Sequence, residues 1–207
     1  MSKLDTTNSI QSRSSSLIVL PRTVAGRVAG MVAARSEAEL YRRSIGLLGL
    51  QLEDAMLEVG CGAGVGIEQA AEIAALGKVC GIETSEALLS AARVRNADAI
   101  EGGYVELRQG LASRLPWPDA TFDKTLAVNS PRDWPQPVVN LSEVRRVMRP
   151  GGKLAVVVQP PWRTAREGVR DLGELWAHRV DEAGFHDVRF GIISVGRKSA
   201  AAMTGTS

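Results

Sequence analysis

Two acidic residues and a glycine-rich loop are the clearest candidates for chemistry in this 207-residue chain. Glu58 lies near the end of a short apolar run, Gly60, Gly62 and Gly64 follow it, and Glu83 ends a second apolar run 25 positions after Glu58. In a unit of strand, tight turn, helix and parallel strand, such a loop binds a nucleoside-bearing ligand, and the distal acid binds the ribose. This arrangement therefore predicts a nucleoside site.

The spacing of the glycines indicates which nucleoside the loop binds. Dinucleotide-binding loops carry glycines at relative positions 1, 3 and 6, whereas this loop carries them at 1, 3 and 5 and has Val65 at the sixth. A pyrophosphate also requires positive potential, but Glu58 brings a negative charge. A carboxylate there suits a cation. S-adenosylmethionine fits these residues, because it has an ammonium and a sulfonium group and no phosphate.

The glycines and Glu83 would contribute to such a site in different ways. Glycine has no side chain, so the backbone of the loop can approach the ligand closely. Glu83 would accept charge-assisted hydrogen bonds from both ribose hydroxyls, each contributing about 1.5–3 kcal/mol. Both acids are therefore expected to flank one cleft.

Four stretches, in this order, resemble successive motifs of the class I S-adenosylmethionine-dependent methyltransferases: LEVGCGAG, GIETSEALLSAAR, LPWPDATFDKTLAV and LSEVRRVMRPGGKLAVV. The nearest branch is the type 11 methyltransferase domain, similar to the ubiquinone and menaquinone C-methyltransferases. The resemblance covers roughly Met56 to Val158, about half of the chain. It implies S-adenosylmethionine as cofactor and a small-molecule methyl acceptor. It also implies an α/β, Rossmann-like, open doubly wound sheet of about seven strands, with the last strand antiparallel and helices on both faces.

The resemblance also assigns residues to the cofactor. Family members usually carry an Asp after the glycine equivalent to Gly110, where it contacts the adenine amino group, but this chain has Leu111. Adenine recognition is therefore expected from backbone groups of Leu111 and Ala112. The complete expected cofactor-binding set is Glu58, Gly60, Cys61, Gly62, Gly64, Glu83, Thr84, Leu111, Ala112 and Asn129.

The acceptor is expected outside the carboxyl ends of the later strands, where open α/β sheets bind ligands. The loop 129–136 follows one such strand and offers Asp133 as the candidate general base and Trp134 as a wall of the pocket. Trp162 follows the next expected strand, and the two tryptophans suggest an apolar or aromatic acceptor. Two alternatives stay open: Asp133 as a turn residue, and both tryptophans as core residues.

Three regions are expected along the chain. Residues 1–16 are rich in Ser, Thr and Asn, which predicts a disordered tail. Residues 17–50 are expected to form a helical lid over cofactor and acceptor, as in the resembling family, with Tyr41 facing the pocket or packing into the core. Residues 51–207 are expected to form the methyltransferase domain.

Apolar periodicity and capping residues predict the helices and strands. Helices are expected at 21–34, from the capping-box pattern at Ser36 to about Gly49, and at 65–76, 85–96, 138–148 and 172–183. Strands are expected at 55–59, 78–82, 104–108, 122–128, 153–158, 185–193 and 199–204. Leu172, Leu175, Trp176 and Val180 are expected to pack on the sheet.

Composition narrows the class of protein further. The hydrophobic content of 44%, the charged content of 23% and the net charge of +2 are typical of a globular domain with no obligate nucleic-acid or membrane partner. No apolar run is long enough for a transmembrane span, so a cytoplasmic location is expected. Cys61 and Cys80 are expected as buried thiols rather than a disulfide. His178 and His186 have no metal-ligand spacing, so no metal site is expected.

Two other classes of protein stay open from the sequence. A nicotinamide-dependent oxidoreductase uses the same kind of sheet, although the glycine spacing and Glu58 argue against it. A noncatalytic cofactor-binding protein is compatible with Leu111 and with the lack of a clear general base. The methyl acceptor, the atom methylated (C, O, N or S), the pathway and the oligomeric state are also open.

Overall fold

The computed structural model describes residues 24–160, 166–196 and 198–207. The expected tail at 1–16 and the expected pocket residue Trp162 lie outside the described residues. Two compact units, Met1–Ala34 and Arg35–Ser207, make up the chain. The second unit contains the sheet and every candidate site residue that is described.

A single long helix, α1, extends from Val24 to Leu48. The prediction of two helices separated near Ser36 was therefore wrong. No proline and no glycine lies between residues 31 and 39, and serine inside a helix costs only a few tenths of a kcal/mol relative to alanine. The capping-box pattern alone does not interrupt the helix. α1 ends before Gly49, whose φ of 59° is left-handed, as is common after a helix.

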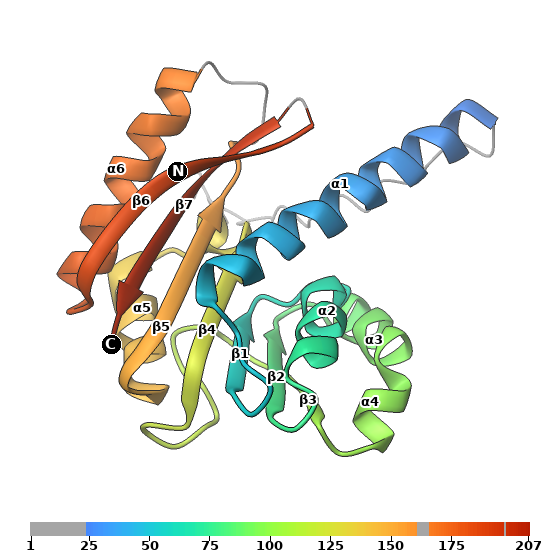
Figure 1. Ribbon diagram of the computed structural model, residues 1–207, viewed down its shortest axis with the longest axis horizontal. Helices are drawn as coiled ribbons and strands as arrows, with labels where there is room; N and C mark the ends of the chain where they lie inside the picture. The colour runs from blue at the N-terminus through green and yellow to red at the C-terminus, as the bar shows by residue number, and fades with distance from the viewer. Residues whose placement is uncertain (1–23, 161–165, 197) are drawn as a thin grey trace, which may run out of the picture. The chain divides into compact units, whose positions relative to one another are not determined.

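Seven strands form one sheet in the order β3-β2-β1-β4-β5-β7-β6 (Figure 1). Their bounds are β1 Ala55–Val59, β2 Lys78–Glu83, β3 Val105–Gln109, β4 Phe122–Val128, β5 Met148–Val158, β6 His186–Val195 and β7 Lys198–Thr206. β1 to β5 pair in parallel, while β7 lies between β5 and β6 and is antiparallel to both. The expected sheet, with its last strand antiparallel, is confirmed.

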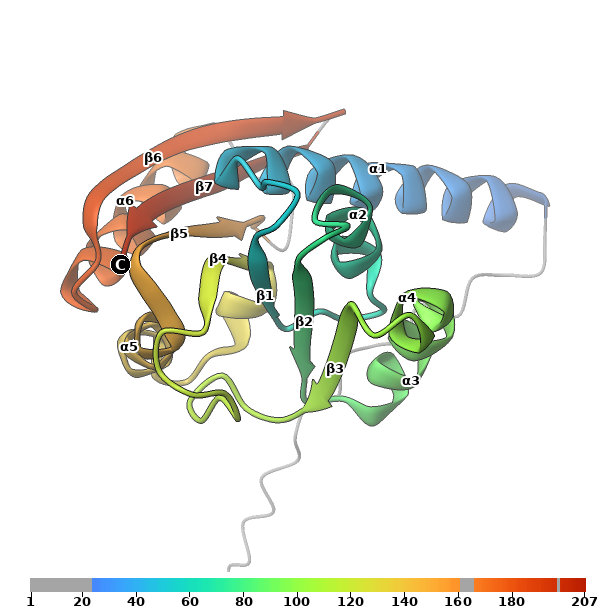
Figure 2. The ribbon, with the colours of Figure 1, turned by 60° about the horizontal axis from the view of Figure 1, so that its bottom comes forward.

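Helices cover both faces of this sheet (Figure 2). Besides α1, the helices are α2 Val65–Ile73, α3 Glu86–Arg95, α4 Ala97–Glu101, the short 3-10 helix η1 Ser130–Asp133, α5 Pro137–Val147 and α6 Arg166–Glu182. The C-terminal part of α1 shares a buried cluster with α2, and α5 shares another with α6. Ser85 caps α3 as expected, because its hydroxyl accepts a hydrogen bond from Leu88 N at 3.4 Å.

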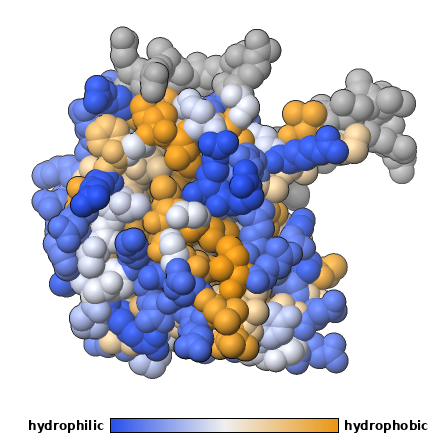
Figure 3. All heavy atoms as spheres, viewed as in Figure 1, coloured by the Kyte–Doolittle hydropathy of each residue, from blue (hydrophilic) through white to orange (hydrophobic). Residues whose placement is uncertain are grey.

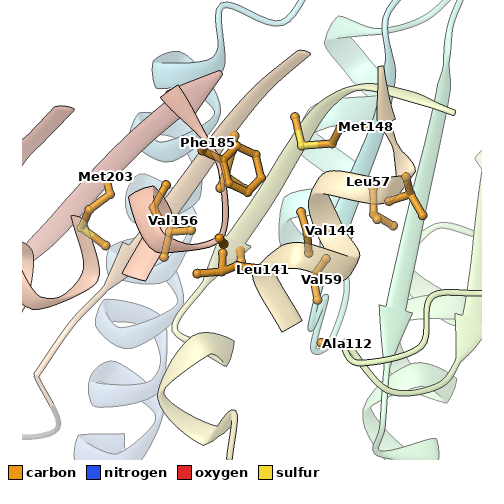
Figure 4. Close-up of a cluster of buried hydrophobic side chains, with 14 of the residues drawn as sticks. Leu57, Val59, Ala112, Leu141, Val144, Met148, Val156, Phe185 and Met203 are labelled. Atoms are coloured by element: carbon orange, nitrogen blue, oxygen red, sulfur yellow. The ribbon is translucent and has the colours of Figure 1, made fainter. Parts of the chain in front are cut away.

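Apolar side chains from β1, α5 and the last strands form one of the two cores (Figure 4). Leu57, Leu141, Val156 and Met203 are completely buried there, although they lie far apart in the sequence. Burial of one such side chain contributes about 1.5–3 kcal/mol to folding. This core therefore fixes β1, and with it the glycine loop that follows β1.

The structure corrects several expected boundaries. α4 was not expected, and β5 begins at Met148, which pairs with Phe122 before a register shift. Leu175 was expected to pack on the sheet, but it is 46% exposed. Leu172 and Trp176 pack into the core, and Leu175 lies between them on the outer side of the helix.

Both hydrophilic and hydrophobic residues reach the surface on the face drawn in Figure 3. In the described part of the second unit, the exposed large apolar side chains include Leu52, Ile73 and Leu76. Within the described residues, no helix combines the length and the apolar character needed to cross a membrane.

Candidate cofactor site

The glycine loop and Glu83 meet because β1 and β2 are parallel neighbours. Val59 lies opposite Ile82, so both strands end at the same edge of the sheet. The backbone N–H groups of Gly60 and Cys61 both donate to the carbonyl oxygen of Ile82, at 2.8 and 3.1 Å. The chain therefore turns into the loop directly beside the end of β2, where Glu83 is the last residue.

Each glycine of the loop has a left-handed φ, namely 78° at Gly60, 52° at Gly62 and 80° at Gly64. A Cβ at Gly60 would lie 2.2 Å from Cβ of Ser130, and one at Gly64 would lie 2.9 Å from Cβ of Ala92. A Cβ at Gly62 would meet nothing within 4 Å. Gly60 and Gly64 are therefore needed for close packing, whereas the backbone at Gly62 adjoins open space that a ligand can use.

Replacing Gly60 by alanine is expected to lower the free energy of unfolding by at least about 2 kcal/mol, because alanine disfavours a left-handed φ and would also clash with Ser130. Gly62→Ala is the matched control. It imposes the same backbone strain without a clash, so a loss of about 1–2 kcal/mol is expected. Urea denaturation of both variants measures the difference. Equal losses would contradict the packing role of Gly60.

Glu83 is aimed at the loop, and its carboxylate is well supplied with hydrogen bonds. Its Oε2 accepts from the backbone N–H of Gly62 at 3.0 Å. Its Oε1 accepts from the N–H groups of Thr84 and Ser85, both at 2.9 Å, and from the Thr84 hydroxyl at 3.2 Å. A carboxylate has about four acceptor positions. Oε2 therefore retains capacity for another donor on the side of the loop.

Glu58, in contrast, is completely buried and unpaired. Neither of its carboxylate oxygens has a hydrogen-bond partner among the described residues. Burial raises the pKa of Glu58 well above its usual value; the Tyr41 hydroxyl opposes this shift, and the charge of Glu83 adds to it. Tyr41 is also buried, so this acid is enclosed rather than open to solvent.

The ends of β4 and β5 adjoin the same loop. Asn129 has a left-handed φ of 59°, and its Oδ1 accepts from the backbone N–H of Gln159 at 2.8 Å. The hydroxyl of Ser130 donates to the carbonyl oxygen of Val59. Arg132 donates to the carbonyl oxygens of Asn129 and Gln159, at 3.2 and 3.1 Å. These contacts hold the chain after β4 beside the end of β1 and over Gly60.

Three residues of this region were missed from the sequence. Ser130, Gln159 and Gly66 shape the site through contacts with residues that are distant in the chain, and such contacts leave no local pattern. Gly66 had one available signal, since it is a fourth glycine within seven residues of the loop. A glycine in the first turn of a helix suggests that another group approaches closely.

Other expected cofactor residues differ in their surroundings. The Leu111 side chain is 61% exposed, whereas Ala112 is buried in the core. Thr84 is exposed, and Cys61 is buried inside the loop. Both Cys61 and Cys80 are buried and free of disulfides, as expected. Burial raises the pKa of both thiols, that of Cys80 to about 12, so neither is an activated nucleophile.

The residues expected to bind the acceptor do not form one group of contacts as the glycine loop and Glu83 do. Asp133 is exposed at the end of η1, and its side chain has no hydrogen bond to the described residues. Trp134 packs edge-on against Trp176 of α6, with 6.2 Å between the ring centroids and an interplanar angle of 74°. This contact gives Trp134 a packing role. Tyr41 is only 7% exposed and lies against Glu58 and Gly66.

Sequence relatives support the cofactor interpretation. A family model described as "Methyltransferase domain" matches residues 57–156. The uncharacterized methyltransferase YdaC of Bacillus subtilis is 30% identical over 162 residues, which cover 78% of this chain and 87% of that protein. Demethylmenaquinone methyltransferase of Symbiobacterium thermophilum is 38% identical over 101 residues, covering 48% of this chain but only 40% of that protein.

Solved structures share the fold at lower identity. An S-adenosylmethionine-dependent methyltransferase from Aquifex aeolicus is 21% identical, has a TM-score of 0.66, and the match covers 81% of this chain and 89% of that one. The [4+2]-cyclase SpnF is 19% identical with a TM-score of 0.67, covering 82% and 81%. These likenesses concern the fold alone.

The chain belongs to the class I S-adenosylmethionine-dependent methyltransferases. Its family match, its relatives and its sheet agree on this class, and S-adenosylmethionine is its cofactor. Membership disfavours the nicotinamide-dependent oxidoreductase that the sequence left open.

Proposed function

We propose that this methyltransferase acts on a small, apolar or aromatic metabolite, with Glu58 binding the ammonium group of the cofactor and Glu83 binding its ribose. The observation that carries the assignment is the buried, unpaired carboxyl of Glu58 beside a left-handed glycine loop. Buried polar atoms without a partner are rare in proteins, and a cationic ligand would supply one here. The donors and acceptors of the site therefore fit this cofactor.

Other residues complete the proposed cofactor site. The backbone of Gly60, Cys61, Gly62 and Gly64 would adjoin the ligand. Thr84, which directly follows Glu83 at the end of β2, would also contact it. Backbone groups of Leu111 and Ala112 would recognise adenine, and Asn129 would contact the cofactor from the end of β4. The hydrogen bond from the backbone N–H of Gly62 to Oε2 of Glu83, at 3.0 Å, supports this assignment because it brings the loop and the acid together.

S-adenosylmethionine supplies a methyl group already activated by its sulfonium. The residues of the chain then have to hold the acceptor in line and keep water away. Such positioning can contribute about 7–11 kcal/mol to lowering a barrier. For this reason no general base is obligatory, although an oxygen or carbon acceptor can require one, and Asp133 is the candidate.

The nature of the acceptor is proposed from the residues beyond β4 and from the relatives. Trp134 lies partly buried after η1, and Trp162 follows β5 in the sequence. Relatives include demethylmenaquinone and 27-O-demethylrifamycin SV methyltransferases, although the chain spans only 40% and 52% of these two proteins. We propose a cytoplasmic enzyme without a nucleic-acid partner, in which residues 17–50 act as a lid.

The direct test incubates the full chain with S-adenosylmethionine and a panel of quinols, phenols and amines, and measures S-adenosylhomocysteine by mass spectrometry. Acceptor-dependent formation of S-adenosylhomocysteine, together with an acceptor whose mass has increased by one methyl group, is the expected result. If the cofactor binds but only charged, nonaromatic acceptors are methylated, the proposed acceptor class is wrong.

Asp133→Asn tests the candidate base. If the acceptor loses its proton to Asp133, kcat is expected to fall by about 10²–10⁴-fold, while the affinity for S-adenosylhomocysteine stays unchanged. Steady-state kinetics and calorimetry measure the two quantities. Asp98→Asn is the control, because Asp98 is an exposed acid on α4. An unchanged kcat in Asp133→Asn would remove Asp133 from the mechanism.

A further inference from the structure

Position 66 requires a glycine for a reason other than backbone conformation. It lies in the first turn of α2 and does not have a left-handed φ. A Cβ at this position would be 2.5 Å from Oε2 and 2.8 Å from Oε1 of Glu58, and 2.8 Å from Cδ1 of Tyr41. The absence of a side chain at Gly66 therefore makes room for both the carboxyl group and the phenol ring.

Glu58, Tyr41 and Gly66 together form an enclosure, which we call the Glu58 enclosure. Glu58 is 0% exposed and Tyr41 is 7% exposed. The residues of the described chain supply no hydrogen bond to either carboxylate oxygen. An isolated charged carboxylate in such a place is strongly disfavoured.

The groups around the Glu58 enclosure provide no positive charge. Tyr41 lies against it from α1, the negative charges of Glu37 on α1 and Glu83 on β2 act on it, and Cys61 lies in the glycine loop. Glu37 and Glu83 are acids, and the phenol and thiol are neutral. Within the described residues, burial and the two acids therefore favour the neutral form of Glu58, and the Tyr41 hydroxyl opposes them.

We propose that Glu58 is a neutral carboxylic acid while Tyr41 covers it, and that binding of the cofactor ammonium releases its proton to solvent. This proposal rests on the proposed function. The O–H bond of Glu58 breaks, the proton passes to bulk water, and the ammonium balances the new carboxylate. Tyr41 is a positioning residue, because its ring must move from the carboxyl group for the ammonium to reach it.

The burial of both side chains supports this coupling. Burial raises the pKa of Glu58, and the same burial raises the pKa of Tyr41 well above its usual value, so both groups hold their protons while Tyr41 covers Glu58. The coupling also gives selectivity for the amino-acid part of the cofactor. A nucleoside without an ammonium cannot replace the lost proton.

Isothermal titration calorimetry of the full chain tests the proposal. S-adenosylhomocysteine is titrated at pH 6.5 in phosphate and in imidazole buffer, and the dependence of the binding enthalpy on the ionisation enthalpy of the buffer gives the number of protons released. At this pH an α-amino group is already protonated. We expect release of about one proton, and an affinity that increases with pH by up to about tenfold for each pH unit. 5′-Methylthioadenosine, which lacks the amino-acid part, is expected to release none.

Three variants separate the roles of the residues. Glu58→Gln is expected to remove proton release and weaken binding. Tyr41→Ala is expected to admit water to Glu58, so that binding persists with less proton release, whereas Tyr41→Phe retains the ring and the release. Glu53→Gln is the control, because this exposed acid lies before the other end of β1.

The outcomes distinguish the proposal from the proposed function. If S-adenosylhomocysteine does not bind to the folded wild-type chain, the proposed function fails. If it binds without proton release, or if Glu58→Gln releases protons as the wild type does, the proposed function stands and the coupling is wrong. Proton release with 5′-methylthioadenosine would also overturn the role of the ammonium.

Discussion

Replacing Glu83 by alanine is expected to weaken the binding of S-adenosylhomocysteine by about 10–100-fold. The variant loses the acceptor position that Oε2 keeps for a ribose hydroxyl, and one charge-assisted hydrogen bond contributes about 1.5–3 kcal/mol. Because about 1.4 kcal/mol corresponds to a tenfold change in affinity, the loss of one such bond gives roughly a 10–100-fold effect. Isothermal titration calorimetry measures it directly.

Part of this loss of affinity would come from the loop itself, because Glu83 also holds the backbone around the site. Its carboxylate also accepts from Gly62 N, Thr84 N and Ser85 N, so alanine releases three backbone donors. Glu83→Gln retains an acceptor oxygen without the charge, and an intermediate loss of affinity is expected. Circular dichroism establishes that both variants fold. An affinity for Glu83→Ala equal to that of the wild type would reject the ribose assignment.

The matched control for Glu83 is Glu86→Ala. Glu86 lies three residues later in the first turn of α3, is largely exposed, and forms one ion pair with Arg93 at 2.8 Å. An exposed pair of this kind contributes little to stability. Binding by Glu86→Ala is expected to equal that of the wild type, which would show that removing a negative charge near β2 is not sufficient to weaken binding.

Replacing Glu58 by glutamine is expected to have opposite effects on stability and on binding. The unliganded variant is expected to have a larger free energy of unfolding than the wild type at pH 7.5, because a neutral amide replaces a buried acid with a raised pKa. Binding of S-adenosylhomocysteine is expected to weaken by about 10–100-fold through loss of the charge. Denaturation and calorimetry measure the two effects.

The pH dependence of this gain has a definite direction. At a pH well below 4.5, the ordinary pKa of glutamate, Glu58 is protonated in both the folded and the unfolded chain. As the pH rises above that value, the unfolded chain releases the proton while the folded chain retains it, so the wild type loses stability. The advantage of Glu58→Gln is therefore absent at low pH and grows toward neutral pH.

Glu53→Gln again serves as the control, since Glu53 is exposed at the turn before β1. Its stability is expected to follow that of the wild type at every pH. If Glu58→Gln were less stable than the wild type at pH 7.5, or if its advantage decreased with rising pH, Glu58 would not be a neutral acid in the folded chain.

The strands and the glycine loop were predictable from the sequence because their signals are local. Short apolar runs predicted β1 and β2, and the glycines predicted a tight turn between β1 and α2. β4 was predicted with both boundaries correct. The antiparallel β7 followed from the family resemblance. The order of the strands in the sheet was not predicted, since residue patterns along single strands do not specify their neighbours.

Contacts between distant segments limited the prediction of the acceptor region. Trp134 was expected in a pocket wall, but its partner Trp176 lies on α6, 42 positions later. The sequence does not distinguish a tryptophan that contacts a ligand from one that packs in the core, because the side chain is suited to both roles. Only the position of α6 on the sheet gives Trp134 its packing contact.

By itself the sequence determined the nucleoside-binding unit, because glycine conformation and apolar periodicity act over a few neighbouring residues. The tertiary structure decided how its two acids differ. Glu83 accepts backbone N–H donors from the loop and from the start of α3, whereas Glu58 is covered by Tyr41 from α1 and has none. Burial and hydrogen bonding set the charge of a carboxyl group, and both depend on segments that only folding brings together.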